Sequence, residues 1–445
     1  MRGTFWVAAY FTLKIAFALC LLKLSANALP VTGFTVFSQL MFFAALLNVL
    51  ALCGAQGGLI RQAAAARDAA ELRQTQDAAF TIWAVAAPAV LLLVFCGHGL
   101  VARMLVGDPA AWKVILALTA TALAGAPGGI WCAMLTGRRR VAQSLSAQAA
   151  GLLAGSGAAA WRILAHDPAG AALAFSAGSM VTGCAALPLA LRLGLPLLPR
   201  PAAWPHVAAL LRYSAAIAAT TGASALVAFG LRWITRDQFG VAQLGYWLAA
   251  SRISDLSTQL VGLFMIQVFV PHLAVIRGDA QRRAFLLRCW ARGAGVMGLF
   301  LAVFSLAPRP LIHIFLSDSY QPAATIIRLC MIGDVLRGWL SLATHTAFAN
   351  GAPQRYAGME IATLAIMAGV AVALTAAGEP NALPIGYLVA NAISAAVISA
   401  VFLGGWEVGS FLKEKPKDFD VPARADAGEA RKYFFFEKKK QKTFD

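Results

Sequence analysis

The sequence predicts an all-α polytopic membrane protein, and three observations lead to that prediction. Hydrophobic residues make up 60% of the 445 positions and charged residues only 13%, whereas soluble domains are nearer a quarter charged. The mean hydropathy is +0.70. The apolar residues also gather into segments of about 20 residues, the length at which a helix crosses a hydrocarbon core of about 30 Å.

Twelve such segments follow one another along the chain, and the linkers between them are too short to hold a soluble domain. Each is long enough to cross the membrane as a helix. In chain order we expect spans at Thr4–Ala26, Phe34–Ala55, Ala79–Val101, Lys113–Leu135, Gln143–Leu164, Gly170–Leu193, Val207–Trp233, Leu244–Leu273, Ala284–Ala307, Pro322–Phe348, Tyr356–Ala376 and Pro384–Trp406.

Basic residues are distributed unevenly among the linkers. The linkers after even-numbered spans carry more of them, including Arg61, Arg67, Arg73, Arg138, Arg139, Arg140, Arg200, Arg277, Arg282, Arg283 and Arg355; the opposite set carries Arg103, Arg236 and Arg309. The positive-inside rule therefore predicts that both termini are cytoplasmic. The net charge of +17 is then largely topological, and it implies no nucleic-acid partner because no solvated basic domain exists.

The first span could instead be read as a signal peptide cleaved after Ala28, because Ala26-Asn27-Ala28 has the spacing of a cleavage site. Lys14 interrupts its apolar region and eleven spans follow, so we expect the segment to be retained. The seven cysteines all fall inside predicted spans without metal-ligand spacing, and we interpret them as small apolar core residues.

A weak internal repeat divides the chain. Ile60-Arg61 leaves the second span and Ile276-Arg277 leaves the eighth, while Gly137 and Gly351 follow the fourth and tenth. The offsets nearly agree (277 − 61 = 216 and 351 − 137 = 214), although short basic turns can resemble one another by chance. We expect an N-terminal six-helix lobe at 1–202 and a C-terminal six-helix lobe at 203–408, joined through the proline-rich linker Leu195–His206.

Three charged residues are expected near the middle of the membrane. Asp255 lies about eleven residues, or roughly 16 Å, from the outer end of its span, and Asp334 and Lys14 have similar depths. Such charges cost about 2.5 to 3.5 kcal/mol at the bilayer centre, so they usually face a bundle interior or a watery path.

Polar neighbours extend two of these positions into helical stripes. Arg252, Asp255 and Gln259 share one face of the eighth span, and Asp334, Arg337, Ser341 and His345 share one face of the tenth. The alternative is that Arg252 with Asp255, and Asp334 with Arg337, are intrahelical ion pairs that only fix the packing. Four arginines nearer the span ends are expected to extend toward lipid headgroups: Arg212, Arg232, Arg288 and Arg292.

The mid-depth set indicates the charge of a ligand. Lys14, Arg252 and Arg337 exceed Asp255 and Asp334 by one positive charge, before the shallower Arg328 is added. A site for cationic drugs would need the reverse, whereas the planar guanidinium group matches phosphate oxygens. The sequence therefore favours an anionic ligand.

Several segments resemble one known family. These are GYWLAASRISD at 245–255, VFVPHLAVIRGD at 268–279, IHIFLSDSYQPAATIIRLCMIGDVLR at 312–337, and the opening FTLKIAFALCLLKLSANALPVTGFTVFSQL at 11–40, which includes Lys14. They are similar to segments of Wzx-type O-antigen and lipid III flippases, from about Phe5 to Trp406. That family belongs to the multidrug, oligosaccharidyl-lipid and polysaccharide exporter superfamily. The resemblance implies two six-helix lobes around a central cavity.

The resemblance also implies a substrate and a location. It implies a flippase of the bacterial inner membrane that moves an oligosaccharide linked by pyrophosphate to undecaprenol from the cytoplasmic to the periplasmic leaflet. Membrane lipid and other polysaccharide-assembly proteins would be its partners. For such a substrate we expect Lys14, Arg252 and Arg337 to bind pyrophosphate, with Arg328 near the outer mouth. We expect sugar contacts from Gln39, Tyr10 and Gln259, and ion coupling through Asp255 and Asp334.

Other functions are weighed against this one. The alternatives are a lipid II flippase, which usually has two more spans, a multidrug exporter, which favours an acidic cavity, and a membrane polymerase or ligase, which needs a large periplasmic loop. No phosphate-cradling GxxxxGK[ST] motif occurs, so we expect a secondary transporter without catalytic residues, cofactor or metal. The charged segment 409–445 is expected to be a disordered tail or a non-native extension, and removing the chain after Glu407 should leave transport unchanged.

Overall fold

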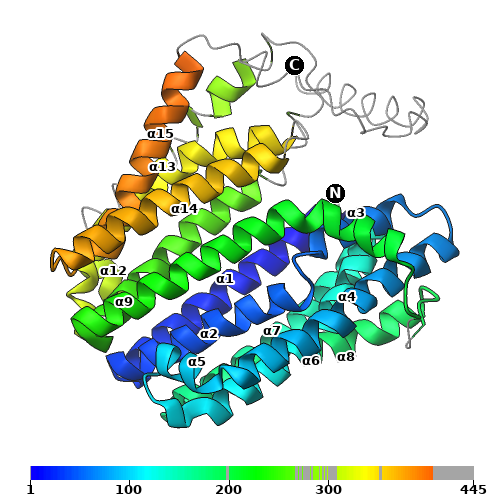
Figure 1. Cartoon of the computed structure of the whole chain (residues 1–445), viewed down its shortest axis with the longest axis horizontal. Coiled ribbons are helices and arrows are strands. Elements are labelled where there is room, and N and C mark those ends of the chain that lie inside the picture. Colours follow the sequence, from blue (N-terminus) through cyan, green and yellow to red (C-terminus); the bar gives the residue numbers. More distant parts are fainter. Residues whose placement is uncertain are drawn as a thin grey trace, which may run out of the picture.

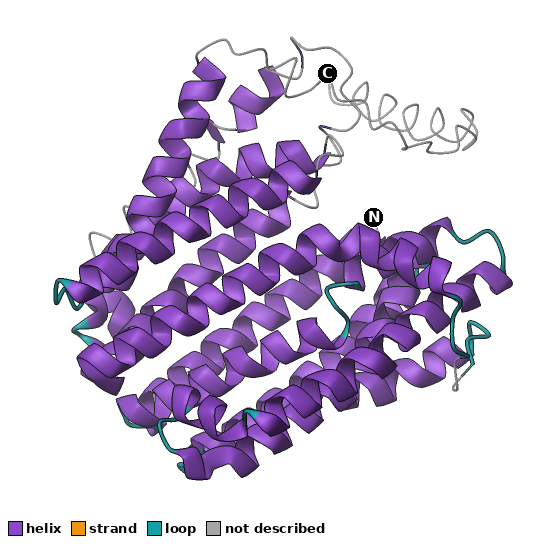
Figure 2. Ribbon diagram, in the orientation of Figure 1, coloured by secondary structure: helices purple, strands orange, loops and turns teal. Residues whose placement is uncertain are grey.

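The structure is a computed structural model that describes residues 2–196, 200–265, 308–349 and 353–403, together with residues 269, 273, 281, 284–289, 291, 292, 295 and 298. Every regular element in this part of the chain is a helix (Figure 2). The prediction of an all-α protein is therefore confirmed. The tail at 409–445, the linker carrying Arg277, the turn at Asn350-Gly351 and most of the ninth predicted span lie outside the described residues.

The first half of the chain forms eight α-helices. The six longer ones, of 21 to 28 residues, correspond to the first six predicted spans. They are α1 (Arg2–Ala28), α2 (Val31–Ala51), α3 (Gln56–Ala65), α4 (Ala69–Cys96), α5 (His98–Leu105), α6 (Trp112–Gly137), α7 (Val141–Leu164) and α8 (Pro168–Leu191), with a short 3-10 turn η1 (Pro109–Ala111) before α6. Helix α4 begins earlier than predicted because the Asp68 side chain accepts hydrogen bonds from the amides of Ala70 and Glu71, both at 2.8 Å.

In the second half the described elements are α9 (Trp204–Phe264), α12 (Pro308–Phe315), η3 (Asp318–Tyr320), α13 (Ala323–Ala349), α14 (Pro353–Ala376) and α15 (Ala382–Leu403). The range of α9 contains two helices that meet at a kink at Gly240, whose φ of 84° and ψ of 171° are non-helical. Gly240 lies between the seventh and eighth predicted spans, but the backbone stays helical up to the kink, so the seventh helix extends beyond its predicted end at Trp233. Glycine adopts this conformation without a steric clash.

Seven helices in the described part of the chain are long and apolar enough to cross a membrane: Ala9–Ala28, Val31–Ala51, Ala69–Cys96, Pro109–Gly137, Pro168–Leu191, Gln354–Ala376 and Ala382–Ala400. Helices α7 and α13 have similar lengths, 24 and 27 residues, but more polar sequences. The polar residues of α13 include the stripe predicted from the sequence. The chain is thus a multi-pass membrane protein.

The helices form two lobes that diverge toward the side on which the N-terminus lies (Figure 1). Helices α1 to α8 make one lobe, in which α1 packs mainly against α7, and α13 to α15 make the other, packed against α9. The lobes approach each other at the end of the bundle where α1 ends and α2 begins, which we call the far end (Figure 1).

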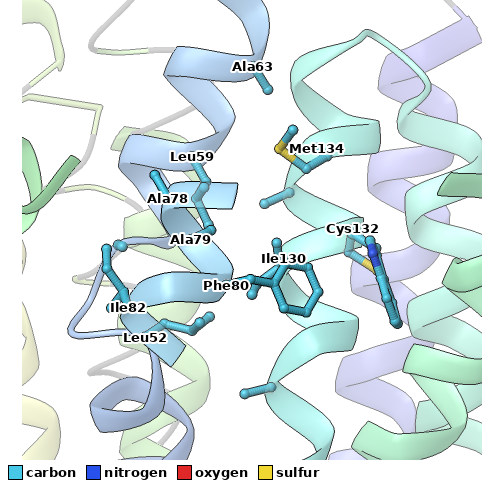
Figure 3. Packing of buried hydrophobic residues seen from close by; sticks show 14 of the residues in the cluster. Leu52, Leu59, Ala63, Ala78, Ala79, Phe80, Ile82, Ile130, Cys132 and Met134 are labelled. Atoms are coloured by element: carbon cyan, nitrogen blue, oxygen red, sulfur yellow. The ribbon is translucent and has the colours of Figure 1, made fainter. Parts of the chain in front are cut away.

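Small residues let the helices of the first lobe pack backbone to backbone. A Cβ atom added at Gly128 of α6 would lie 2.7 Å from the backbone of Gly183 in α8. A membrane interior offers little hydrophobic drive for helix association, so close packing of this kind carries more of the stabilisation. Beside this contact, Phe80 of α4 packs toward Ile130 of α6 in a cluster of buried apolar residues (Figure 3).

Candidate functional site

Asp334 lies at the same level as the polar stripe of α9. Its side chain is 3% exposed, and its Oδ1 atom accepts hydrogen bonds from Ser254 Oγ and Tyr387 OH, both at 2.8 Å. Ser254 precedes Asp255 in α9, so the two predicted acidic positions do share one depth. The contact joins α9, α13 and α15 around a carboxylate, which we call the Asp334 cluster (Asp334, Ser254 and Tyr387).

Arg337 is paired with a residue of another helix. It donates a 2.5 Å hydrogen bond to Glu360 Oε2 of α14. The predicted intrahelical partner, Asp334, is one turn away on α13. Both side chains of the pair are mostly covered, with 29% of the Arg337 and 10% of the Glu360 side chain exposed. Because Glu360 compensates its charge, Arg337 is less suited to phosphate binding than its depth suggested.

Arg232 was expected to extend toward lipid headgroups, and the structure corrects this. Its Nη1 atom donates to Gln39 Oε1 of α2 at 3.3 Å, and its guanidinium carbon lies 3.9 Å from the centre of the Phe42 ring. These contacts direct the side chain toward α2. The reason is that α9 continues to Gly240, so Arg232 is about 12 Å from the bend rather than at the end of a span.

Arg252 and Asp255 lie close enough to Arg232 for all three charges to interact electrostatically. Arg252 is half-buried. Asp255 is exposed. A carboxylate at mid-depth is costly against lipid and is tolerated where it faces a bundle interior or a watery path. We call Arg232, Arg252, Asp255, Gln39 and Phe42 the arginine cluster.

The remaining predicted residues make few contacts. Lys14 of α1 is exposed and bonds to no other residue in the described part of the chain, and Arg328 of α13 and Gln259 of α9 are also exposed. Tyr10 is half-buried, with its ring 6.1 Å from that of Phe11 in an edge-to-face arrangement. Gln39 is only 2% exposed and already accepts from Arg232, so it is not placed to bind a sugar.

The structure thus divides the predicted mid-depth set. Arg252 and Asp255 join the arginine cluster, whereas Asp334 and Arg337 take part in separate contacts that connect helices. Reasoning from the sequence did not place Arg232 in the site. The segment from Leu231 to Phe239 contains no glycine or proline, which favours a helix that continues past Trp233.

A family model described as "Polysaccharide biosynthesis protein" matches residues 29–325. No curated protein matches the sequence.

Solved structures share the fold at low sequence identity. The inward-facing conformation of a multidrug resistance MATE family transporter of the MOP superfamily is 14% identical with a TM-score of 0.71, covering 91% of this chain and 99% of that one. Lipid II flippase MurJ in an inward closed conformation is 13% identical with a TM-score of 0.69, covering 90% and 87%. An outward-facing conformation of a MATE family transporter is 14% identical and covers 92% and 94%, but its TM-score is 0.53.

Proposed function

Since the chain belongs to the family of polysaccharide biosynthesis proteins, we propose that it is a Wzx-type flippase. In this proposal it moves an oligosaccharide, linked to a polyprenol by pyrophosphate, from the cytoplasmic to the periplasmic leaflet of a bacterial inner membrane. Its termini are cytoplasmic, and the two lobes, residues 1–202 and 203–408, rock about the mid-depth site to give alternating access. The shared fold with MATE transporters and with MurJ supports movement of a substrate rather than its chemical conversion.

The arginine cluster is the observation that carries the proposal. Two guanidinium groups, Arg232 and Arg252, lie near a single carboxylate, Asp255, at a depth where unpaired charge is costly. Arginine binds phosphate oxygens through paired, charge-assisted hydrogen bonds. A pyrophosphate group would satisfy this excess of positive charge, and a cationic drug would increase it.

Each residue then has a role in the proposal. Arg252, Arg232 and Lys14 bind the pyrophosphate, Gln39 orients Arg232, and Arg328 contacts the anion nearer the far end. Exposed Gln259 and half-buried Tyr10 bind sugar hydroxyls, and the polyprenyl chain stays in lipid between the lobes. Arg337 supports the fold through Glu360.

The two acidic residues differ as coupling groups. Asp255 is accessible and interacts with both arginines, so its protonation would release positive charge toward the substrate. Asp334 is covered and held by two hydroxyl groups, so its protonation would loosen the contact among α9, α13 and α15. Both remain candidates, the first acting on the ligand and the second on the conformation.

The proposal is tested with Arg252→Ala, Arg232→Met and Lys14→Ala in cells that lack their own flippase for a lipid-linked glycan. We expect loss of surface polysaccharide at unchanged membrane levels of protein. Arg292→Ala is the matched control, because Arg292 is an exposed arginine of the same chain outside the cluster.

A binding measurement separates the alternatives. The purified protein should bind undecaprenyl-pyrophosphate glycan and lose that binding in Arg252→Ala. Preference for a cationic dye would indicate a drug exporter, preference for lipid II a lipid II flippase, and chain extension of the glycan a membrane enzyme. Normal transport by both Arg252→Ala and Arg232→Met would refute the role of the arginine cluster.

A further inference from the structure

Two basic side chains at the far end bind carbonyl groups in the opposite half of the sequence. Lys23 of α1 donates to the carbonyl oxygens of His313 and Leu316 at the end of α12, at 2.5 and 2.6 Å. Arg236 of α9 donates to the carbonyl oxygens of Arg103 and Val106 at the end of α5, at 3.1 and 2.6 Å. Figure 1 places α5, α12 and this part of α9 at the same end of the molecule.

The two contacts are related by the internal repeat. The first acceptors are 210 residues apart (313 − 103 = 210), and so are the second (316 − 106 = 210). The two donors are 213 residues apart (236 − 23 = 213). Helices α5 and α12 both have eight residues, and each is followed by a short 3-10 turn. The same type of contact therefore occurs twice: a basic side chain of the first half binds the end of a helix in the second half, and a basic side chain of the second half binds the end of a helix in the first.

The chemistry of the acceptors explains why a cation binds there. The last carbonyl groups of a helix have no partner within the helix, and they carry the negative end of its dipole. Lysine and arginine side chains can satisfy such carbonyls and benefit from the dipole. Here the donor is supplied by the other half of the chain, so satisfying the helix end also fixes one half to the other.

Other contacts reinforce this junction. Ser317 Oγ, next to α12, donates to the carbonyl oxygen of Ala26 in α1 at 2.8 Å. The rings of Phe34 and Tyr320 meet edge to face with 5.4 Å between their centres. The far end is therefore closed by contacts between the two halves, while the lobes diverge at the other end (Figure 1).

We propose that Lys23 and Arg236 are twin latches that hold the far end closed, and that both must release before that end can open. The inference rests on the proposed transport function only for its effect on activity, since the latches themselves set a conformational equilibrium. Their acceptors are backbone carbonyls, which do not titrate. Closure by the latches should therefore not depend on the protonation of a carboxylate.

The test measures the separation of the halves in the full-length protein without substrate. Spin labels are placed at two exposed far-end positions, Ala110 in η1 and Thr325 in α13, in a background without native cysteines, and distances are measured by double electron–electron resonance in lipid nanodiscs. Lys23→Met and Arg236→Met should each raise the ratio of long to short distances by on the order of tenfold or more, because each removes charge-assisted hydrogen bonds. The double variant should shift it further.

Matched controls keep the result specific. Lys113→Met and Arg309→Met remove exposed charges of the same end, and we expect no shift; Lys113 contacts Trp112 beside it in the chain. Lys23→Arg and Arg236→Lys retain the donors and should restore the short distance, which separates loss of the latch from poor folding. An unchanged distribution in the double variant, or an equal shift in the controls, would overturn the proposal. Because no substrate is present, failure of the proposed glycan transport would leave this measurement unaffected.

Discussion

The ion pair between Arg337 and Glu360 leads to a prediction that separates a structural arginine from a substrate-binding one. Arg337→Met removes the partner of a carboxylate whose side chain is 10% exposed. Glu360 would then be a covered, uncompensated charge between α13 and α14. A pyrophosphate-binding arginine would behave differently, since its loss would abolish transport while leaving the folded protein stable.

The magnitude follows from burial. Removing one member of a fully buried pair costs about 3–5 kcal/mol. Because Arg337 retains 29% exposure, screening reduces this cost, and we expect about 2–4 kcal/mol. At roughly 2 °C per kcal/mol, the low end for large domains, the melting temperature should fall by about 4–8 °C. Replacing both residues by methionine removes the unpaired charge, and such a replacement is often close to neutral.

The assay is thermal unfolding of the purified protein in detergent, compared with transport in cells. Arg337→Met should melt several degrees below the parent, and Arg337→Met combined with Glu360→Met should recover most of the loss and much of the transport. Arg292→Met, at an exposed site, is the control. If Arg337→Met melts like the parent and still abolishes transport, or if the double variant is as unstable as the single one, the assignment of Arg337 to structure is wrong.

Three further predictions concern the site and the packing. Asp255→Asn removes the carboxylate near Arg232 and Arg252, so the affinity for undecaprenyl-pyrophosphate glycan should rise by on the order of tenfold, about 1.4 kcal/mol, measured by equilibrium binding; weaker binding would contradict its role. Arg232→Lys keeps the charge but loses the planar contact with Phe42, so glycan transport in cells should fall less than in Arg232→Met, and equal loss would indicate that the guanidinium shape matters more than charge. Gly128→Leu drives a side chain into the backbone of Gly183, which should cost at least about 1–3 kcal/mol and lower the melting temperature, whereas the same change at Gly157, where a Cβ would meet nothing within 4 Å, should have little effect.

The sequence predicts the helices well because lipid constrains them strongly. A spanning segment must satisfy its backbone internally and remain apolar for about 20 residues, and both properties are visible in one dimension. The bend at Gly240 was harder to place, since the polar residues Thr235 to Gln238 suggest a loop while their backbone stays helical. The seventh span was therefore predicted to end too early, at Trp233, and Arg232 was left out of the predicted site.

Partners of charged residues were less predictable, because they depend on how helices rotate against one another. Asp334 and Arg337 are one turn apart and could have been paired from the sequence alone. The carboxylate instead accepts from α9 and α15, and the guanidinium donates to α14. Glu360 is the one charged residue of an otherwise apolar span, and nothing in the sequence places it opposite Arg337.

The excess of one positive charge that the sequence predicts at mid-depth is still present in the structure, but different residues supply it. Arg337 no longer counts, because Glu360 compensates it, but Arg232 replaces it. Among the described mid-depth residues, Lys14, Arg232 and Arg252 then stand against Asp255 and Asp334, which leaves one net positive charge. Protonation of Asp255 would raise this to two, the number of negative charges on a pyrophosphate diester. A site whose charge matches its ligand only after an acid is protonated would bind that ligand and a proton together, so the same residues that favour an anion also offer a way to couple its movement to a proton gradient.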